Sequence, residues 1–136
     1  RRGESRLPRI DFSPIVWHRF PMTQTIYKIL PRQLWEEAKQ QGRLDGAPVD
    51  LADGFIHFST SAQVRETAAR HFSGQNDLLL VAVDPAPLGE ALRYETSRGG
   101  ALFPHLYGSL PVEAVLWVED LPIGPDGHHL FPGSMR

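Results

Sequence analysis

Residues 53–84 read DGFIHFSTSAQVRETAARHFSGQNDLLLVAVD, and this stretch decides the fold because three expected elements follow one another in it. The short apolar run Gly54–Phe58 predicts a strand. Leu78–Val83 is a continuous apolar run of strand length, which is typical of a strand buried on both faces. Asp84 and Pro85 end that strand, since proline cannot donate a hydrogen bond to a sheet.

A helix is expected between these two strands, over 62–72. Thr60 and Gln63 have the spacing of a capping box, in which a hydroxyl caps the helix and an amide three residues later bonds back. Gly74 follows the helix and suits the left-handed conformation of a C-terminal cap. One face of this helix is expected to hold residues spaced at i, i+3, i+4 and i+7, namely Val64, Thr67, Ala68 and His71.

The candidate chemistry lies where the first strand meets the helix. Alternate side chains of a strand face opposite ways, so if Ile56 and Phe58 face the core, His57 and Ser59 share the other face. Ser59 and Thr60 then open a helix whose free backbone N–H groups favour anions. The alternative is a solvent-facing strand histidine followed by an ordinary helix cap. For this stretch alone, we prefer that interpretation.

Composition excludes several kinds of protein. The chain has 136 residues, which predicts one domain, and no cysteine, which excludes disulfides and thiolate chemistry. The formal net charge of −2 argues against an extended nucleic-acid surface. No apolar run approaches the roughly 20 residues needed to span a bilayer, and we expect a cytoplasmic protein. We expect residues 1–21 to be an N-terminal extension or tail, and residues 22–136 to form the domain.

Further elements are expected on both sides of this stretch. Before it, a strand over 25–30 precedes a helix that starts near Pro31, buries Leu34, Trp35 and Ala38, and ends at Gly42; residues 43–52 are expected to form a loop. After it come a turn over 85–89, a strand over 91–94, a loop over 95–100 and a strand over 112–118. The strand-rich second half predicts an α+β fold, with two main helices packed on a mixed or split β-sheet.

Several peptides resemble a known family when they are taken in order. They are IYKIL at 26–30, DGFIHFST at 53–60, ARHF at 69–72, RYETSRGGALFPHLYG at 93–108 and LPVEAVLWVEDLP at 110–122. Together they resemble domain-of-unknown-function family 952, an uncharacterised family of bacterial type, over about Ile26 to Pro122. The resemblance implies a fold similar to the ADP-ribosyltransferase superfamily, with the local match strongest to the RNA 2′-phosphotransferase branch.

The resemblance implies site residues in three motifs. The second motif, a histidine followed by an apolar and a hydroxyl residue, matches His57–Phe58–Ser59. The first motif falls on Tyr27–Lys28, although Ile29 stands where that branch has glycine. The third motif is a glutamate near the start of a late strand and falls on Glu113, without the second acidic or amide residue two positions earlier. NAD is the cofactor that this resemblance implies.

The leading hypothesis is a pocket for a nucleotide-like or phosphate-bearing ligand, resembling NAD or ADP-ribose, with ADP-ribosyl or phosphoryl-type transfer as its chemistry. His57, Ser59, Arg98, His105 and Tyr107 are expected to line one cleft. Each candidate residue also has a purely structural explanation, such as sheet packing for Tyr107 or a surface ion pair for Arg98. Their expected roles are a floor of His57, Ser59 and Thr60, phosphate neutralisation by Lys28 or Arg98, stacking by Tyr27 or Tyr107, a ribose contact from His105, and oxocarbenium stabilisation by Glu95 or Glu113.

Two other functions fit the same residues. One is a non-catalytic module that binds a small ligand or a protein. The other is a hydrolase with His57 as general base, since histidine titrates near neutral pH. No metal site is expected, because the adjacent His128 and His129 supply only two ligands on a turn-rich tail. Oligomeric state does not follow from the sequence.

Overall fold

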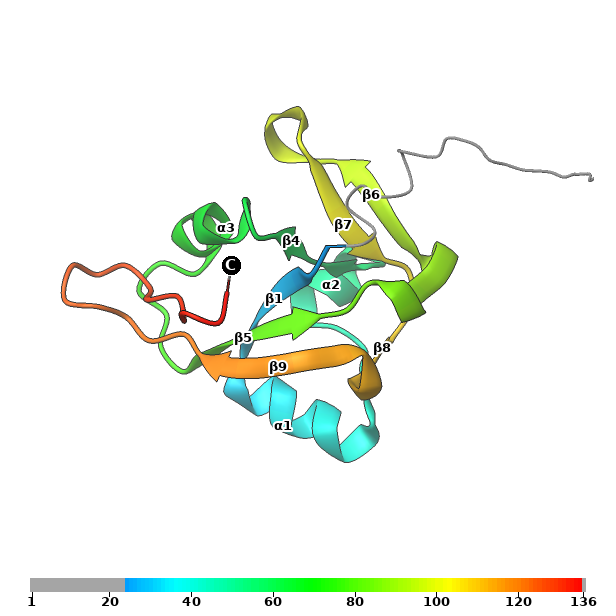
Figure 1. The fold of residues 1–136 in the computed structure, drawn as a ribbon, viewed down its shortest axis with the longest axis horizontal. Coiled ribbons are helices and arrows are strands. Elements are labelled where there is room, and N and C mark those ends of the chain that lie inside the picture. Colours follow the sequence, from blue (N-terminus) through cyan, green and yellow to red (C-terminus); the bar gives the residue numbers. More distant parts are fainter. Residues whose placement is uncertain (1–23, 136) are drawn as a thin grey trace, which may run out of the picture.

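The computed structural model describes residues 24–135, so the expected N-terminal extension at 1–21 lies outside the described residues. Helices and strands alternate in the first half, and the second half is rich in strands (Figure 1). The order is β1 (Ile26–Pro31), α1 (Arg32–Gln41), β2 (Arg43–Leu44), α2 (Pro48–Asp53), β3 (Ile56–His57), β4 (Ser59–Thr60), α3 (Val64–His71), β5 (Leu78–Val83), β6 (Leu92–Thr96), β7 (Leu102–Leu106), β8 (Leu110–Pro111) and β9 (Val115–Asp120), with short 3₁₀ turns at Ala86–Ala91, Arg98–Gly100 and Val112–Ala114. The expected α+β class is confirmed.

The main sheet has four strands in the order β4-β1-β5-β9. The predicted buried strand Leu78–Val83 is β5, and all six of its residues are buried. It pairs with the whole of β1, from Ile26 opposite Val83 to Pro31 opposite Leu78. Its continuous apolar run therefore reflects a central strand with structure on both faces.

The two longer helices cover opposite faces of this sheet, α1 below it and α3 above it in Figure 1. Trp35 and Ala38 of α1 pack in one core cluster, whereas Val64 and Ala68 of α3 pack in the other. Side chains alternate accordingly along the strands. One cluster contains Ile26, Leu30, Leu79, Val81, Ile56 and Phe58, and the other contains Tyr27, Ile29, Leu78 and Leu80. The predicted core residues Ile56, Phe58, Leu79 and Val81 are thus confirmed.

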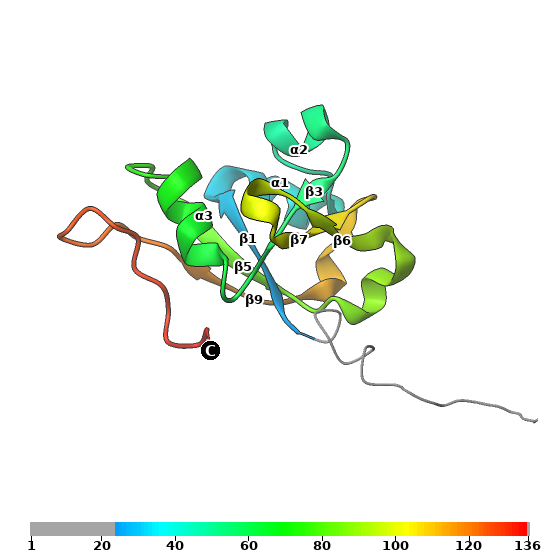
Figure 2. The same cartoon turned by 90° about the horizontal axis from the view of Figure 1, so that it is seen from above.

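A second sheet of three strands, in the order β3-β7-β6, stands beside α2 (Figure 2), and β2 pairs with β8. The chain passes between the two larger sheets at Phe58, since β3 belongs to one and β4 to the other. This arrangement agrees with a split sheet. Every strand pair within residues 24–135 is antiparallel, so the alternative of a mixed sheet is wrong.

The expected loop over 43–52 is wrong, because it contains β2 and α2. Pro48 suits the first turn of a helix, where no backbone N–H is needed. The Asp50 carboxylate then accepts a hydrogen bond from the backbone N–H of Ala47 at 2.8 Å. Ala47, the N-cap residue, has no hydroxyl or carboxylate of its own. Without such a capping residue, the sequence does not predict the helix.

The second helix starts later than expected. Thr60 lies in β4, and α3 begins at Val64 after a turn. Half of the predicted capping contact nevertheless forms, since the amide oxygen of Gln63 accepts from the backbone N–H of Thr60 at 3.0 Å. Pairing of Thr60 with Ile26 keeps this residue in the sheet and delays the helix.

Two boundaries in the second half also differ from expectation. Glu95 lies within β6, not in a loop, because β6 continues to pair with β7 as far as Thr96 and Leu102. The last strand begins at Val115, and Glu113 lies in the 3₁₀ turn before it, not at the start of a strand. No helix among residues 24–135 has the length and apolar character needed to cross a membrane.

Candidate functional site

A cavity of about 530 Å³ lies where the two larger sheets separate. Strand β4 pairs with β1 only at Ile26 and Tyr27, so the cavity adjoins the remaining edge of β1. Its lining comes from β1, α2, β3, β4, α3, β7 and the turn before β7. The lining residues are Tyr27, Lys28, Ile29, Val49, Asp53, His57, Phe58, Ser59, Thr67, His71, Phe72, Ser97, Phe103 and His105.

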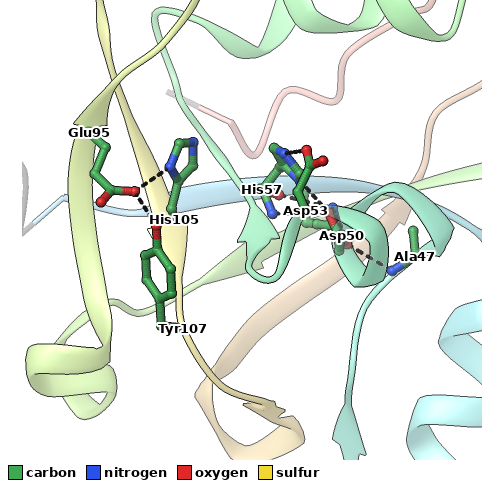
Figure 3. A network of polar contacts seen from close by, with 8 residues as sticks. Ala47, Asp50, Asp53, His57, Glu95, His105 and Tyr107 are labelled. Carbon is green, nitrogen blue, oxygen red and sulfur yellow. Dashed lines mark hydrogen bonds and ion pairs between the residues drawn. The ribbon is translucent and has the colours of Figure 1, made fainter.

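His57 contacts a carboxylate through each of its ring nitrogens (Figure 3). Nδ1 lies 2.6 Å from Oδ1 of Asp50, and Nε2 lies 2.9 Å from Oδ2 of Asp53. Both contacts are hydrogen bonds when both nitrogens carry protons, which is the imidazolium form. Because both acids belong to α2, this six-residue helix determines how the His57 ring is oriented.

Asp50 is the buried centre of this arrangement, with 2 % of its surface exposed. Besides the His57 ring, it accepts from the backbone N–H groups of Ala47 and His57 and from the ammonium group of Lys28. Burial alone would raise the pKa of Asp50, but the hydrogen bond from His57 and the charge of Lys28 outweigh that effect and lower it to about 2. Asp50 is therefore a carboxylate near neutral pH.

Lys28 lies in the interior beside the cavity and is already paired. Its ammonium group lies 2.9 Å from Oδ2 of Asp50 and donates to the backbone oxygen of His57 at 3.0 Å. Burial lowers the pKa of Lys28, and the charge of Asp50 opposes this shift. The sequence predicts Lys28 as a phosphate-neutralising residue; the structure gives it a carboxylate partner within the chain.

A second histidine, His105, is also held by a carboxylate (Figure 3). Nδ1 of His105 lies 2.8 Å from Oε1 of Glu95, and the hydroxyl of Tyr107 donates to the same oxygen at 2.8 Å. The hydrogen bonds from His105 and Tyr107 lower the pKa of Glu95. The ring of Phe55 stacks on His105, with centroids 4.1 Å apart. These contacts orient the imidazole of His105 from two sides.

The two histidines are direct neighbours across strands β3 and β7, where His57 pairs with His105. Their ring centroids are 5.6 Å apart in an edge-to-face arrangement. His105 is 5 % exposed, and its Nε2 has no polar partner within residues 24–135. Two carboxylate-held imidazoles therefore share one wall of the cavity.

Hydroxyl groups lie on the α3 side of the cavity. Ser59 is buried, and its Oγ lies 2.9 Å from Oγ1 of Thr67, which also donates to the backbone oxygen of Gln63. Ser59 thus lines the cavity together with His57, as expected. Thr60 is not among the lining residues, because its alternate position in the strand directs it elsewhere.

Several predicted site residues lie outside the cavity. Glu113 is exposed and does not line it, and Tyr107 contacts the site only through Glu95 and the ring of Phe55. Tyr27 lines the cavity as a buried residue of β1. The side chain of Arg98 lies outside the described part of the chain. Of the five residues expected in one cleft, His57, Ser59 and His105 share the cavity.

Asp50, Asp53 and Phe55 belong to the site but are absent from the sequence-based set. The available signal was the spacing of Asp53 and His57, which are four residues apart. Assignment of 43–52 to a loop concealed it, because only a helix ending at Asp53 brings both acids to the imidazole. Among the described residues, no cluster of three or more acidic, histidine or cysteine side chains has a geometry suited to a metal ion.

A larger groove of about 690 Å³ lies between α1 and the C-terminal segment. Its basic side chains, Arg32 and Lys39, both form ion pairs within the chain. Arg32 bonds to Asp77 and Asp120, and Lys39 bonds to Glu36. Because these pairs already satisfy the basic groups of the groove, the smaller cavity with its two histidines is the candidate site.

A protein-family model described as "Protein of unknown function (DUF952)" matches residues 29–118. The crystal structure of protein CC0527 from Caulobacter crescentus is 54% identical, covers 79% of this chain and 94% of its own, and has a TM-score of 0.76. The solution NMR structure of CC0527 is 56% identical, covers 76% of this chain and 90% of its own, and has a TM-score of 0.70. No curated protein matches the chain.

Proposed function

The chain belongs to the DUF952 family of proteins of unknown function, and we propose that its cavity binds a nucleotide-like ligand that carries phosphate. The supporting observation is the pair of neighbouring imidazoles, His57 and His105, each held by a carboxylate on the same cavity wall. Imidazolium N–H groups donate charge-assisted hydrogen bonds to phosphate oxygens. Carboxylates behind the rings hold them in place.

The size and lining of the cavity support a ligand with an aromatic ring. Its volume of about 530 Å³ falls within the range of about 300–1,000 Å³ that is usual for small-molecule sites. Aromatic side chains at Tyr27, Phe58, Phe72 and Phe103 supply apolar surface for a base or a nicotinamide ring.

We further propose transfer chemistry in this cavity, of the ADP-ribosyl or phosphoryl type, on a fold related to ADP-ribosyltransferases. Antiparallel sheets that separate at the site, with α1 and α3 on opposite faces, support this relation. Neither Glu95 nor Glu113 is a lining residue of the cavity, but Glu95 is the better candidate for stabilising an oxocarbenium ion, because it bonds to His105, which does line it. NAD is the co-substrate that such chemistry would use.

One observation favours a non-catalytic binding module instead. Both ring nitrogens of His57 are bonded to carboxylates, so neither is free to exchange a proton with a substrate in this arrangement. The two candidates differ in turnover and not in binding. Incubation with NAD and 2′-phosphorylated RNA, followed by mass spectrometry, distinguishes them: nicotinamide release together with an RNA that has gained ADP-ribose supports transfer, and unchanged NAD and RNA support the binding module.

Binding is tested by titrating the ¹⁵N-labelled protein with NAD, ADP-ribose and 2′-phosphorylated RNA. We expect the amide signals of His57, Ser59 and His105 to shift together. His57→Ala and His105→Ala should each weaken binding about tenfold or more, because a hydrogen bond to a charged group is lost. His128→Ala is the matched control, since His128 is exposed on the C-terminal segment outside the cavity. Absence of shifts with all three ligands would overturn the proposal.

A further inference from the structure

We infer that the carboxylate of Asp53 is an internal competitor of the ligand: in the free protein it occupies the position at Nε2 of His57 that an anionic group of the ligand takes on binding. This inference rests on the proposed function and assigns the anion subsite within the cavity. The subsite lies at Nε2 of His57, beside the ring of His105, whose centroid is 5.6 Å from that of His57. Asp53 must leave it before an anion enters.

The two carboxylates that hold His57 differ in how firmly they are themselves held. The Asp50 side chain is 1 % exposed and has further hydrogen bonds from Lys28 and from the backbone of Ala47 and His57. The Asp53 side chain is 47 % exposed, and within residues 24–135 its only polar partner is Nε2 of His57. Loss of that single contact exposes Asp53 to water and leaves no buried charge without a partner, so Asp53 is the displaceable member.

The position of Asp53 in the chain also permits its movement. It is the last residue of α2, and Gly54 follows it in the left-handed conformation with φ of 88°. A change of rotamer moves the carboxylate toward solvent without disturbing the helix, whose first turn is held by Asp50. Asp50 meanwhile continues to bond to Nδ1, so the Nε2 atom stays directed toward the cavity.

His105 supplies the second half of the subsite. Its ring is buried, its Nδ1 is held by Glu95, and its Nε2 has no polar partner among the described residues. A buried nitrogen without a partner is costly unless a ligand or water satisfies it. When both rings are in the imidazolium form, an anion that replaced Asp53 would accept from Nε2 of His57 and Nε2 of His105 together, whereas Asp53 contacts His57 alone.

The charge of the ligand sets how strongly it is attracted to this subsite. A phosphodiester carries one negative charge, so its entry replaces the single charge of Asp53 with an equal one. A phosphate monoester carries about −1.5 to −2 charges near neutral pH and three acceptor oxygens, so it gains attraction to both imidazoles. We therefore expect the site to favour a terminal phosphate over an internal one. Displacement of Asp53 costs the same for both ligands, so Asp53 lowers both affinities and leaves this preference unchanged.

Asp53→Asn tests this inference, because it removes the charge and keeps the shape. The probes are adenosine 5′-monophosphate, 3′,5′-cyclic adenosine monophosphate and inorganic phosphate, measured by calorimetry on the full chain. We expect Asp53→Asn to bind both adenosine nucleotides about tenfold or more tightly than the parent protein does, because neither ligand then displaces a charged competitor. The control Glu90→Gln removes the same charge from an exposed residue outside the cavity and should change neither affinity.

The outcomes separate this inference from the proposed function. If the parent protein binds adenosine 5′-monophosphate and Asp53→Asn binds it equally or more weakly, the competition by Asp53 is refuted and the binding site stands. If neither protein binds any probe and the amide titration with NAD, ADP-ribose and RNA is also silent, both ideas fail. A melting temperature of Asp53→Asn close to that of the parent protein excludes misfolding as an explanation.

Discussion

The ammonium group of Lys28 lies 2.9 Å from the carboxylate of Asp50, and their side chains are 6 % and 1 % exposed. This buried pair joins the main sheet to α2, across 22 positions of sequence. Because the His57 ring is bonded to the same carboxylate, the pair also determines the geometry of the site. Stability of the fold and orientation of the histidine therefore depend on one group.

Asp50→Ala should lower the free energy of unfolding by about 3–5 kcal/mol, because it leaves the Lys28 charge buried without a partner. Urea denaturation measures this change. Asp45→Ala is the matched control from the preceding loop: its bonds to Arg43 and Ser109 are exposed, and exposed ion pairs contribute at most about 1 kcal/mol. If both variants lose the same free energy of unfolding, the Lys28–Asp50 pair contributes no more than an exposed ion pair.

Stability should depend on pH through Asp50. Its pKa in the folded protein is about 2, below the ordinary value of 3.8, so the unfolded chain binds a proton first as pH falls. The stabilisation is complete above about pH 5 and is lost progressively as pH falls from about 4 toward 2. The difference in unfolding free energy between the parent protein and Asp50→Asn should shrink over this interval. A difference that stays constant from pH 7 to pH 2.5 would contradict the assignment.

His57→Ala and Phe58→Ala should differ in stability. Phe58 is a buried core residue, and its truncation should cost about 3–5 kcal/mol. Truncation of His57 leaves no core cavity but removes a hydrogen bond from the buried carboxylate of Asp50, which should cost about 1–3 kcal/mol. Thermal melts of both variants test the order. If His57→Ala melts as early as Phe58→Ala, His57 is primarily a structural residue.

Two glycines that flank α2 should differ in their tolerance of a side chain. Both have positive φ, so alanine is strained at either position. A Cβ at Gly46 would lie 2.8 Å from the Cβ of Asp50, whereas a Cβ at Gly54 meets nothing within 4 Å. Gly46→Ala should therefore be the more destabilising change and should also weaken ligand binding by shifting Asp50. Denaturation curves that coincide for the two variants would argue against this clash.

The parts of the fold that sequence predicts well are those with a strong local pattern. The apolar run of β5 fits a buried strand, and the stripe of Trp35 and Ala38 fits a helix with one buried face. Both elements are found as expected. Strand β4 illustrates the limit. Thr60 has a good local signal for a helix cap, but pairing with Ile26 outweighs it.

The same limit applies to the site. The sequence predicts that His57 and His105 line one cleft, and both residues line the cavity. Asp50 and Asp53 could not be assigned, since their roles depend on α2, which has no capping side chain at Ala47. The sequence predicts that Lys28 neutralises a phosphate, but Lys28 forms an ion pair with Asp50 instead. This contact is long-range in sequence, so no local pattern predicts it.

Tyr27 lines the cavity, and its ring centroid also lies 6.0 Å from that of Trp117 on β9. A ligand that displaces or polarises this phenol would alter the surroundings of the indole. The chain contains three tryptophans, so changing Trp17 and Trp35 to phenylalanine leaves Trp117 as the single strong emitter. The protein thereby contains an intrinsic fluorescent reporter of cavity occupancy, and ligand libraries can be screened by its emission without attaching a dye.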